Sequence, residues 1–158
     1  MRELLDISPE VRAALAVRGP VVGLETTLVA HGFPAPSGIE IGLESEAAIR
    51  DAGALPATIG VLDGRIRVGL TEDELDRFTP AARKLGPRDL AACAIAGAVG
   101  ATTVGGTLAV ARALGIHFLG TGGIGGVHRG YPSPPDVSAD LPALASTPCG
   151  PRARTTSP

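Results

Sequence analysis

A run of glycines behind a short apolar segment decides how the fold is read: Leu119-Gly-Thr-Gly-Gly-Ile-Gly-Gly-Val-His-Arg-Gly-Tyr131. The segment before it, Gly115-Ile-His-Phe-Leu119, has the composition of a short strand. A strand that ends in glycines lets backbone N–H groups approach an anion with no Cβ atom in the way. A histidine and an arginine inside the run add donors, and the carboxylates Asp136 and Asp140 follow. The stretch therefore predicts a phosphate site with a metal or polar sugar contacts beside it.

The segments before this run alternate between helix and strand signals. Ser8-Pro9-Glu10 combines a capping serine, a proline at the first helical position and an early acid, which predicts a helix over 8–18 that stops at Gly19. Residues 20–25 have the pattern of a buried strand ending on a carboxylate. We expect Ser37 to cap the next helix, which ends at Gly53.

The middle of the chain carries the strongest local signals. Two apolar runs, 57–62 and 65–69, flank Asp63-Gly64, which predicts a hairpin with a two-residue turn. A capping box at 71–74 opens a short helix, and further helices are expected over 87–96 and 102–114. This order of elements predicts a layered α/β domain over 1–148, followed by a disordered tail at 149–158.

Composition narrows the function. The chain has 158 residues, of which 44% are hydrophobic and 3% aromatic, and its net charge is −2. Without a basic face or stacking aromatics, a nucleic-acid polymer is not expected as a partner. No apolar run approaches the roughly 20 residues of a membrane span, and the N-terminus has no secretion signal, so we predict a cytoplasmic protein.

Five blocks of sequence, in order, resemble the pseudouridine-5'-phosphate glycosidase family: residues 23–32, 61–70, 102–104, 122–130 and 136–141. The resemblance covers about residues 8–148. It implies an α/β/α sandwich that is incomplete at its C-terminal side, because members of the family are nearly twice as long. It also implies reversible cleavage of pseudouridine 5'-phosphate to uracil and ribose 5-phosphate, a glutamate as proton donor, a manganese ion near the phosphate, and a homotrimer.

The resemblance assigns roles to individual residues, each with a plainer alternative. Glu25 matches the proton donor, although a strand-end acid is as often structural. Lys84 and Val104 match substrate contacts, with a solvated helix end and ordinary helix packing as the alternatives. Asp136 matches the manganese ligand, and such an Asp is otherwise a turn or cap residue.

The segment Ser138, Ala139 and Asp140 matches the part of the family that holds the substrate's polar groups. Ser138 alternatively caps a helix that begins near Leu141. His128 and Arg129 are secondary candidates for binding phosphate, and His31 is a candidate for orienting Glu25. We expect His117 to be a buried core histidine.

One family feature is missing. The family's imine-forming lysine lies beyond the segment matching residues 141–148, and Lys84 is the only lysine in this sequence. Arginine is no substitute, because its guanidinium stays protonated and is not a nucleophile. We therefore expect this chain to be inactive alone. Two alternatives stay open. One is a non-catalytic module that binds sugar phosphate and metal, or that joins other subunits. The other is a dinucleotide-binding domain, for which the glycine spacing fits poorly.

Overall fold

The computed structural model describes residues 2–34, 36–133 and 135–147, and its centre is a seven-stranded sheet. The predicted tail at 149–158 lies outside these residues. The strands are β1 (Leu5–Ile7), β2 (Val21–Glu25), β3 (Leu55–Leu62), β4 (Arg65–Val68), β5 (Arg83–Leu85), β6 (Gly100–Thr102) and β7 (Phe118–Gly120). The helices are α1 (Pro9–Ala16), α2 (Ser37–Asp51), α3 (Glu72–Leu75), α4 (Leu90–Ile95), α5 (Val104–Leu114) and α6 (Asp140–Ser146). A 3-10 turn (Arg2–Leu4) precedes β1, and a π-helical turn (Leu28–Gly32) follows β2.

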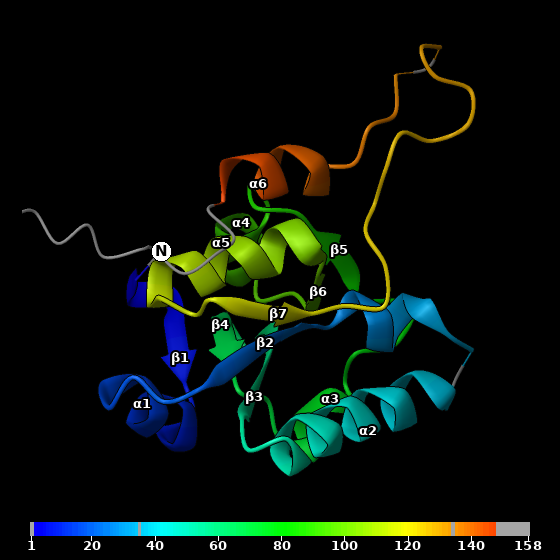
Figure 1. The fold of residues 1–158 in the computed structure, drawn as a ribbon. Coiled ribbons are helices and arrows are strands. Elements are labelled where there is room, and N and C mark those ends of the chain that lie inside the picture. The colour runs from blue at the N-terminus through cyan, green and yellow to red at the C-terminus, as the bar shows by residue number, and fades with distance from the viewer. Residues whose placement is uncertain (1, 35, 134, 148–158) are drawn as a thin grey trace, which may run out of the picture.

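Helices cover both faces of the sheet, which confirms the α/β/α sandwich. Figure 1 shows α4, α5 and α6 on one side of the strands, and α1, α2 and α3 on the other. The contacts agree that helices pack on the central strand: α1, α2, α4 and α5 all contact β3, and α6 lies on α5. β3 is buried from Pro56 to Leu62, as expected for a central strand covered on both faces.

Two strands share one side of β3. β2 runs parallel to its first half, with Glu25 opposite Ile59, and β6 runs antiparallel to its second half, with Ala101 opposite Gly60. The carboxyl ends of β2 and β6 therefore meet head to head at Ile59. Because β7 is parallel to β2 and β5 is parallel to β6, the carboxyl ends of four strands converge at this corner of the sheet.

Buried threonines hold this corner together. The hydroxyls of Thr26 and Thr102 both donate to the carbonyl oxygen of Ile59, at 2.9 and 2.7 Å. The backbone N–H of Thr102 donates to the Thr26 hydroxyl at 2.9 Å, and the Thr107 hydroxyl of α5 donates to that of Thr102. Thr26, Thr102 and Thr107 are almost fully buried, and each finds a partner, as buried polar groups require.

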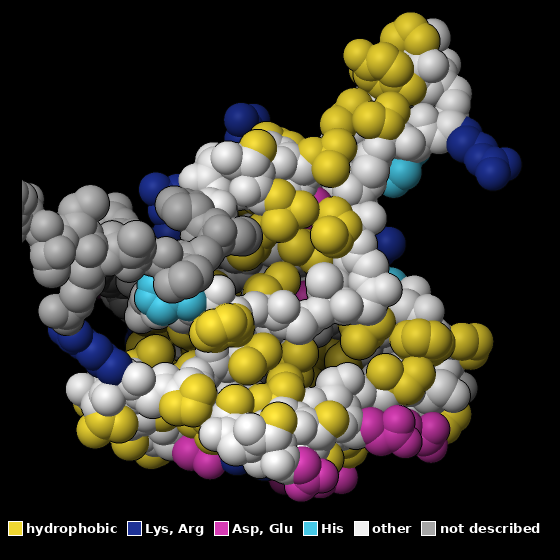
Figure 2. Space-filling view, viewed as in Figure 1, with side chains coloured by type: hydrophobic (Ala, Val, Ile, Leu, Met, Phe, Trp, Pro, Cys, Tyr) yellow, Lys and Arg dark blue, Asp and Glu magenta, His cyan; other side chains and the backbone are white. Residues whose placement is uncertain are grey.

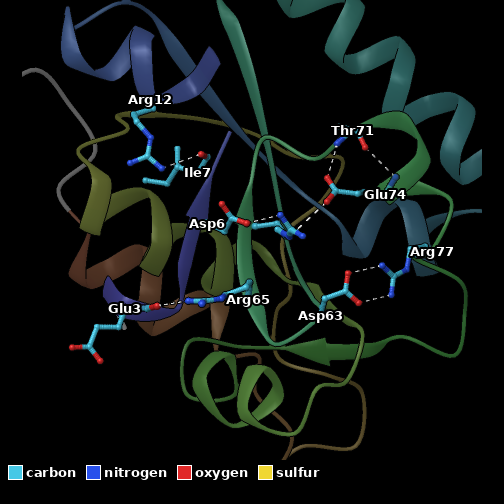
Figure 3. Close-up of polar contacts among 10 residues, drawn as sticks. Glu3, Asp6, Ile7, Arg12, Asp63, Arg65, Thr71, Glu74 and Arg77 are labelled. Carbon is cyan, nitrogen blue, oxygen red and sulfur yellow. Dashed lines mark hydrogen bonds and ion pairs between the residues drawn. The ribbon is translucent and has the colours of Figure 1, made fainter. Parts of the chain in front are cut away.

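Several local predictions are confirmed. Ser8 caps α1 by accepting from Val11 N–H, and β3 and β4 form the hairpin, with positive φ at both Asp63 and Gly64. Figure 3 shows both hydrogen bonds of the capping box between Thr71 and Glu74. It also shows Arg77 bound to both oxygens of Asp63, at 2.7 and 2.8 Å, which holds the hairpin turn to the residues after α3.

Other predictions need correction. α1 ends at Ala16 rather than near Arg18, because Arg18 takes a left-handed conformation and the Gly19 N–H donates back to Ala14. α4 starts at Leu90, after a turn over 87–89.

The start of α2 also differs, since Ser37 is its first residue rather than its cap. The pattern does not predict β1, β5 or β6, three-residue strands whose partners are distant in sequence. Within the described part of the chain, no helix is long and apolar enough to cross a membrane.

Candidate functional site

Glu25 lies where the four strand ends converge. It is the last residue of β2, and only 8% of its surface is exposed. The Thr121 hydroxyl, one residue beyond β7, lies 2.5 Å from Glu25 Oε1 and is placed to donate to it. The pKa of Glu25 is raised, mainly because the carboxyl group is buried. The hydrogen bond from Thr121 lowers this pKa, and the nearby charge of Asp140 raises it further. A carboxyl group in this environment retains its proton at higher pH than an exposed glutamate, as a proton donor requires.

Asp140 is the second acid of this corner and is 5% exposed. Its carboxylate accepts the Gly105 N–H at 2.7 Å and the Gly125 N–H at 3.0 Å. Gly105 lies in the first turn of α5, where free N–H groups and the helix dipole favour a negative charge. Asp140 therefore joins three segments: the start of α6, the start of α5 and the glycine run. These two hydrogen bonds give its side chain a structural role within the site, and the substrate contact expected from the sequence stays a prediction.

Val104 is the first residue of α5 and is 1% exposed. Thr103 caps the helix through Gly106 N–H, and Asp140 takes Gly105 N–H. Among the described residues, Val104 N–H has no hydrogen-bond acceptor. A helix N-terminus with such a donor suits an anionic or carbonyl oxygen, in agreement with a predicted contact through the backbone of Val104.

Ser138 and Ala139 lead into α6 at the edge of the same site. The Ser138 hydroxyl accepts the Asp140 N–H at 3.2 Å and so contacts the start of the helix, although α6 begins at Asp140 and Ser138 is not its N-cap. Ala139 is exposed and stands at the N-cap position of α6.

Lys84 lies on β5, one residue before the strand end, and is exposed. Its side chain carries its charge close to His31: burial and then the Lys84 charge lower the pKa of His31. His31 contacts the carbonyl oxygen of Ala82 at 3.1 Å rather than Glu25, so the predicted orienting role is wrong. His117 is exposed just before β7, so the prediction that it is a buried core histidine is wrong.

Asp136 lies outside the buried corner, on an arm formed by residues 121–133 and 135–139. Figure 1 shows this arm leaving the body after β7 and returning to α6. Near its base, Gly126 to His128 pair with Asp136 to Ser138 through backbone hydrogen bonds of 3.0 and 2.9 Å. Asp136 Oδ2 also lies 2.7 Å from Nδ1 of His128, and both side chains are more than half exposed.

The arm offers few side chains to a divalent cation. No group of three or more His, Cys, Asp or Glu side chains comes together in the part of the chain that the structure describes. Asp136 Oδ1 is uncommitted among those residues, and a hard cation that keeps waters and phosphate oxygens needs few carboxylates. Asp136 thus fits the expected manganese ion as a single ligand beside the His128 contact.

Two N–H groups of the glycine run are bound by the protein itself, so they are not free for the anion site predicted from the sequence. Gly125 N–H is taken by Asp140, and Gly123 N–H donates to the Thr121 hydroxyl at 3.1 Å. The protein's own oxygens satisfy these donors because the run folds back on the corner where both acids lie. A Cβ at Gly125 would come within 2.2 Å of the Ser138 hydroxyl oxygen, so close packing explains this glycine.

An open groove of about 390 Å³ begins at Glu25 and Thr121 and continues over apolar side chains of β2 and α2. Its apolar walls include Leu24, Leu28 and Ile49. Figure 2 shows hydrophobic side chains gathered on the same front of the molecule. The site therefore has a polar end, at the strand ends, and an apolar extension.

Sequence reasoning missed Thr121 as a partner of Glu25, and Gly105 as a partner of Asp140. Thr121 closely follows a predicted strand, and that position is the sequence signal for it as a site residue. Nothing in the local sequence indicates the second, because Gly105 and Asp140 are 35 positions apart.

Comparison with known proteins shows which family this chain is similar to. A family model described as "Indigoidine synthase A like protein" matches residues 10–150. The chain is 52% identical over 148 residues to the pseudouridine-5'-phosphate glycosidase of Rhodospirillum centenum, covering 93% of this chain and 46% of that protein. It is 53% identical over 143 residues to that of Streptomyces griseus, covering 89% and 44%. The chain thus spans about half the length of the curated relatives it matches.

Two solved structures are also similar to this chain. The prealnumycin C-glycosynthase AlnA, in complex with ribulose 5-phosphate, matches with a TM-score of 0.76 and 42% identity, over 89% of this chain and 46% of that chain. An indigoidine synthase A-like protein from Thermotoga maritima matches with a TM-score of 0.72 and 40% identity, over 80% of this chain and 43% of that chain.

Proposed function

The chain belongs to the indigoidine synthase A-like family that includes the pseudouridine-5'-phosphate glycosidases. We propose that it carries the proton donor of such a glycosidase site. The observation that supports this most is Glu25: a buried carboxyl group with a raised pKa, at the meeting point of four strand ends. Ligands of α/β sheets bind outside the carboxyl ends of strands, where such groups converge.

The proposed reaction gives Glu25 a defined task. Cleavage of pseudouridine 5'-phosphate breaks the bond between C1' of the sugar and C5 of uracil and consumes one water. The water oxygen ends on C1' of ribose 5-phosphate, and C5 must gain a proton to become uracil. Glu25 donates that proton and regains it in the reverse direction. Thr121 orients the carboxyl group, and the neighbouring Asp140 charge favours its protonated form.

Sugar phosphate binding is the second part of the proposal. Lys84 supplies an exposed positive charge, and Val104 supplies an N–H at the start of α5. A ribulose 5-phosphate complex of the related AlnA supports a sugar 5-phosphate as the ligand class. We propose separately that Asp136 binds manganese, which would add positive charge beside the phosphate.

One experiment tests both parts. We expect ribose 5-phosphate to bind the purified chain saturably in calorimetry, and Lys84→Ala to weaken this binding while Arg88→Ala, an exposed basic control, does not. We expect no release of uracil from pseudouridine 5'-phosphate, because Lys84 is the only lysine and is assigned to the phosphate. Uracil release that Glu25→Gln abolishes would refute inactivity, whereas the absence of any saturable binding would refute the site.

The metal is tested in the same experiment. Mn²⁺ should tighten ribose 5-phosphate binding, and Asp136→Asn should remove that gain without affecting binding in the absence of metal. An equal gain in the variant would place the metal elsewhere.

We also propose that the chain associates as a homotrimer. The arm exposes the apolar side chains of Ile124, Val127, Tyr131 and Val137, each at least 47% exposed. Contiguous exposed apolar groups of this kind mark interaction sites. Light scattering on the eluting protein should give a mass of three chains, and a monomer at every concentration would contradict the proposal.

A further inference from the structure

Thr121 carries one hydroxyl group that lies within hydrogen-bond distance of three polar groups. Its Oγ1 lies 2.5 Å from Glu25 Oε1 and 2.7 Å from the carbonyl oxygen of Gly123. The Gly123 N–H donates to the same Oγ1 at 3.1 Å. A threonine hydroxyl has one hydrogen to donate and two lone pairs that accept. The three contacts together therefore specify which group supplies each hydrogen.

The carbonyl oxygen of Gly123 decides this assignment. A carbonyl oxygen carries no hydrogen, so the hydrogen between it and Oγ1 is that of Thr121. The Thr121 hydrogen is then not available to Glu25, and the contact between Glu25 and Thr121 requires a hydrogen on the carboxyl group. In this arrangement Oγ1 accepts from Glu25 and from the Gly123 N–H, and it donates to the Gly123 carbonyl oxygen. Each of these hydrogens has an acceptor.

An ionised Glu25 satisfies the same groups less well. Thr121 would then donate to the carboxylate, and Oγ1 would face the Gly123 carbonyl oxygen at 2.7 Å with no hydrogen between the two atoms. Asp140 faces Glu25 from α6, and both of its carboxylate oxygens accept backbone N–H groups. Burial and the charge of Asp140 both raise the pKa of Glu25, so they favour the same assignment as the hydrogen-bond geometry.

We infer that Thr121 keeps the proton on Glu25, because its hydroxyl accepts the carboxyl hydrogen while its own hydrogen is held by the Gly123 carbonyl oxygen. Thr121 is thus a positioning residue that presents a lone pair to the proton donor. The inference deepens the proposed function and rests on it, since the retained proton is the one that Glu25 gives to C5 of uracil. When that proton leaves, the hydrogen of Thr121 stays on Thr121.

The direction of the hydrogen bond sets the sign of the test. Glutamate carboxyl ¹³C signals of the full chain are followed against pH by NMR, and Glu25→Gln assigns the Glu25 signal. Thr121→Val removes the acceptor, so the Glu25 titration midpoint should move to lower pH by at least about 0.5. Thr121→Ser retains the hydroxyl and should leave the midpoint as in the unchanged chain. Thr121 is exposed, and Thr121→Ala removes the hydroxyl a second time with a smaller side chain.

Thr58 and Glu46 form the matched control pair. The Thr58 hydroxyl donates to Glu46 Oε1, and among the described residues it has no second acceptor. Burial is the main cause that raises the pKa of Glu46; the hydrogen bond from Thr58 and the charge of Arg50 lower it, and Glu10 raises it. Thr58→Val should therefore move the Glu46 midpoint to higher pH, which is opposite in sign to the change expected at Glu25. Glu46→Gln assigns this signal.

Two results would overturn the inference. A Glu25 midpoint that rises when the Thr121 hydroxyl is removed would show that Thr121 donates to the carboxylate, and an unchanged midpoint would show that it holds no proton. Ribose 5-phosphate binding to the unchanged chain separates this failure from failure of the proposed function. Saturable binding with an unmoved Glu25 midpoint refutes the inference alone. The expected midpoint change without any binding refutes the sugar phosphate site and leaves the hydrogen-bond assignment standing.

Discussion

Replacing Asp140 tests the structural centre of the candidate site. Its carboxylate holds Gly105 N–H and Gly125 N–H at 2.7 and 3.0 Å, so Asp140→Ala leaves two donors without their acceptor. Each unsatisfied buried donor costs about 1–3 kcal/mol, and relief of burying the charge offsets part of the sum. We expect Asp140→Ala to lower the free energy of unfolding by about 2–4 kcal/mol, out of roughly 5–15 kcal/mol for a domain.

Two further variants make the test specific. Asp140→Asn retains one acceptor oxygen, so its loss should be about half as large, roughly 1–2 kcal/mol. Asp89→Ala is the control, since this exposed carboxylate accepts one backbone donor, Gly86 N–H at 2.9 Å. We expect it to cost less than about 1 kcal/mol, as an exposed cap does.

Urea unfolding followed by circular dichroism measures these differences directly. Hydrogen exchange at Gly105 and Gly125 adds a local readout, which should accelerate in Asp140→Ala before the chain unfolds globally. If Asp140→Ala matched the control within about 0.5 kcal/mol, the carboxylate would not join α5 to the glycine run, and the reasoning would be refuted.

Three other outcomes follow from single residues. Because the pKa of Glu25 is raised in the folded state, its stabilising contribution is complete below the unfolded value of about 4.5 and is lost as pH rises through the folded value. Glu25→Gln should therefore melt at a higher temperature than the unchanged chain at neutral pH but not near pH 4, and a constant difference would contradict this. Gly60→Ala would place a Cβ 2.4 Å from Phe78 Cζ and should cost about 1–3 kcal/mol, while Gly123→Ala, with open space around it, should not. Ser8→Ala removes the cap of α1 and should cost about 1 kcal/mol in urea unfolding; no loss would mean that the cap contributes nothing.

The sequence predicts those elements whose signals are local. The Asp63-Gly64 turn requires positive φ at both residues, and these two residue types adopt positive φ at low cost. The hairpin can therefore be predicted from these two residues. The cap at Ser8 and the box at Thr71 depend on residues three positions apart, and both are confirmed.

The sequence does not reveal features that depend on distant partners. β5 is a strand because Lys84 pairs with Ala101, and nothing within three residues indicates that partner. The same limit applies to the site: Glu25 ends a recognisable strand, but its proximity to Asp140 arises only when α6 packs on α5. The sequence predicts an anion site at the glycine run, but it does not indicate that Asp140, 15 positions away, accepts the Gly125 N–H.

The position of the two buried acids restricts how a charged ligand enters. Glu25 and Asp140 occupy the inner end of the site, and the Asp140 carboxylate would repel a doubly negative group placed against it at close range. Lys84, in contrast, presents its ammonium group to solvent. If the proposed ligand class is right, we therefore expect a phosphorylated sugar to enter with its uncharged ring leading and its phosphate trailing toward the surface.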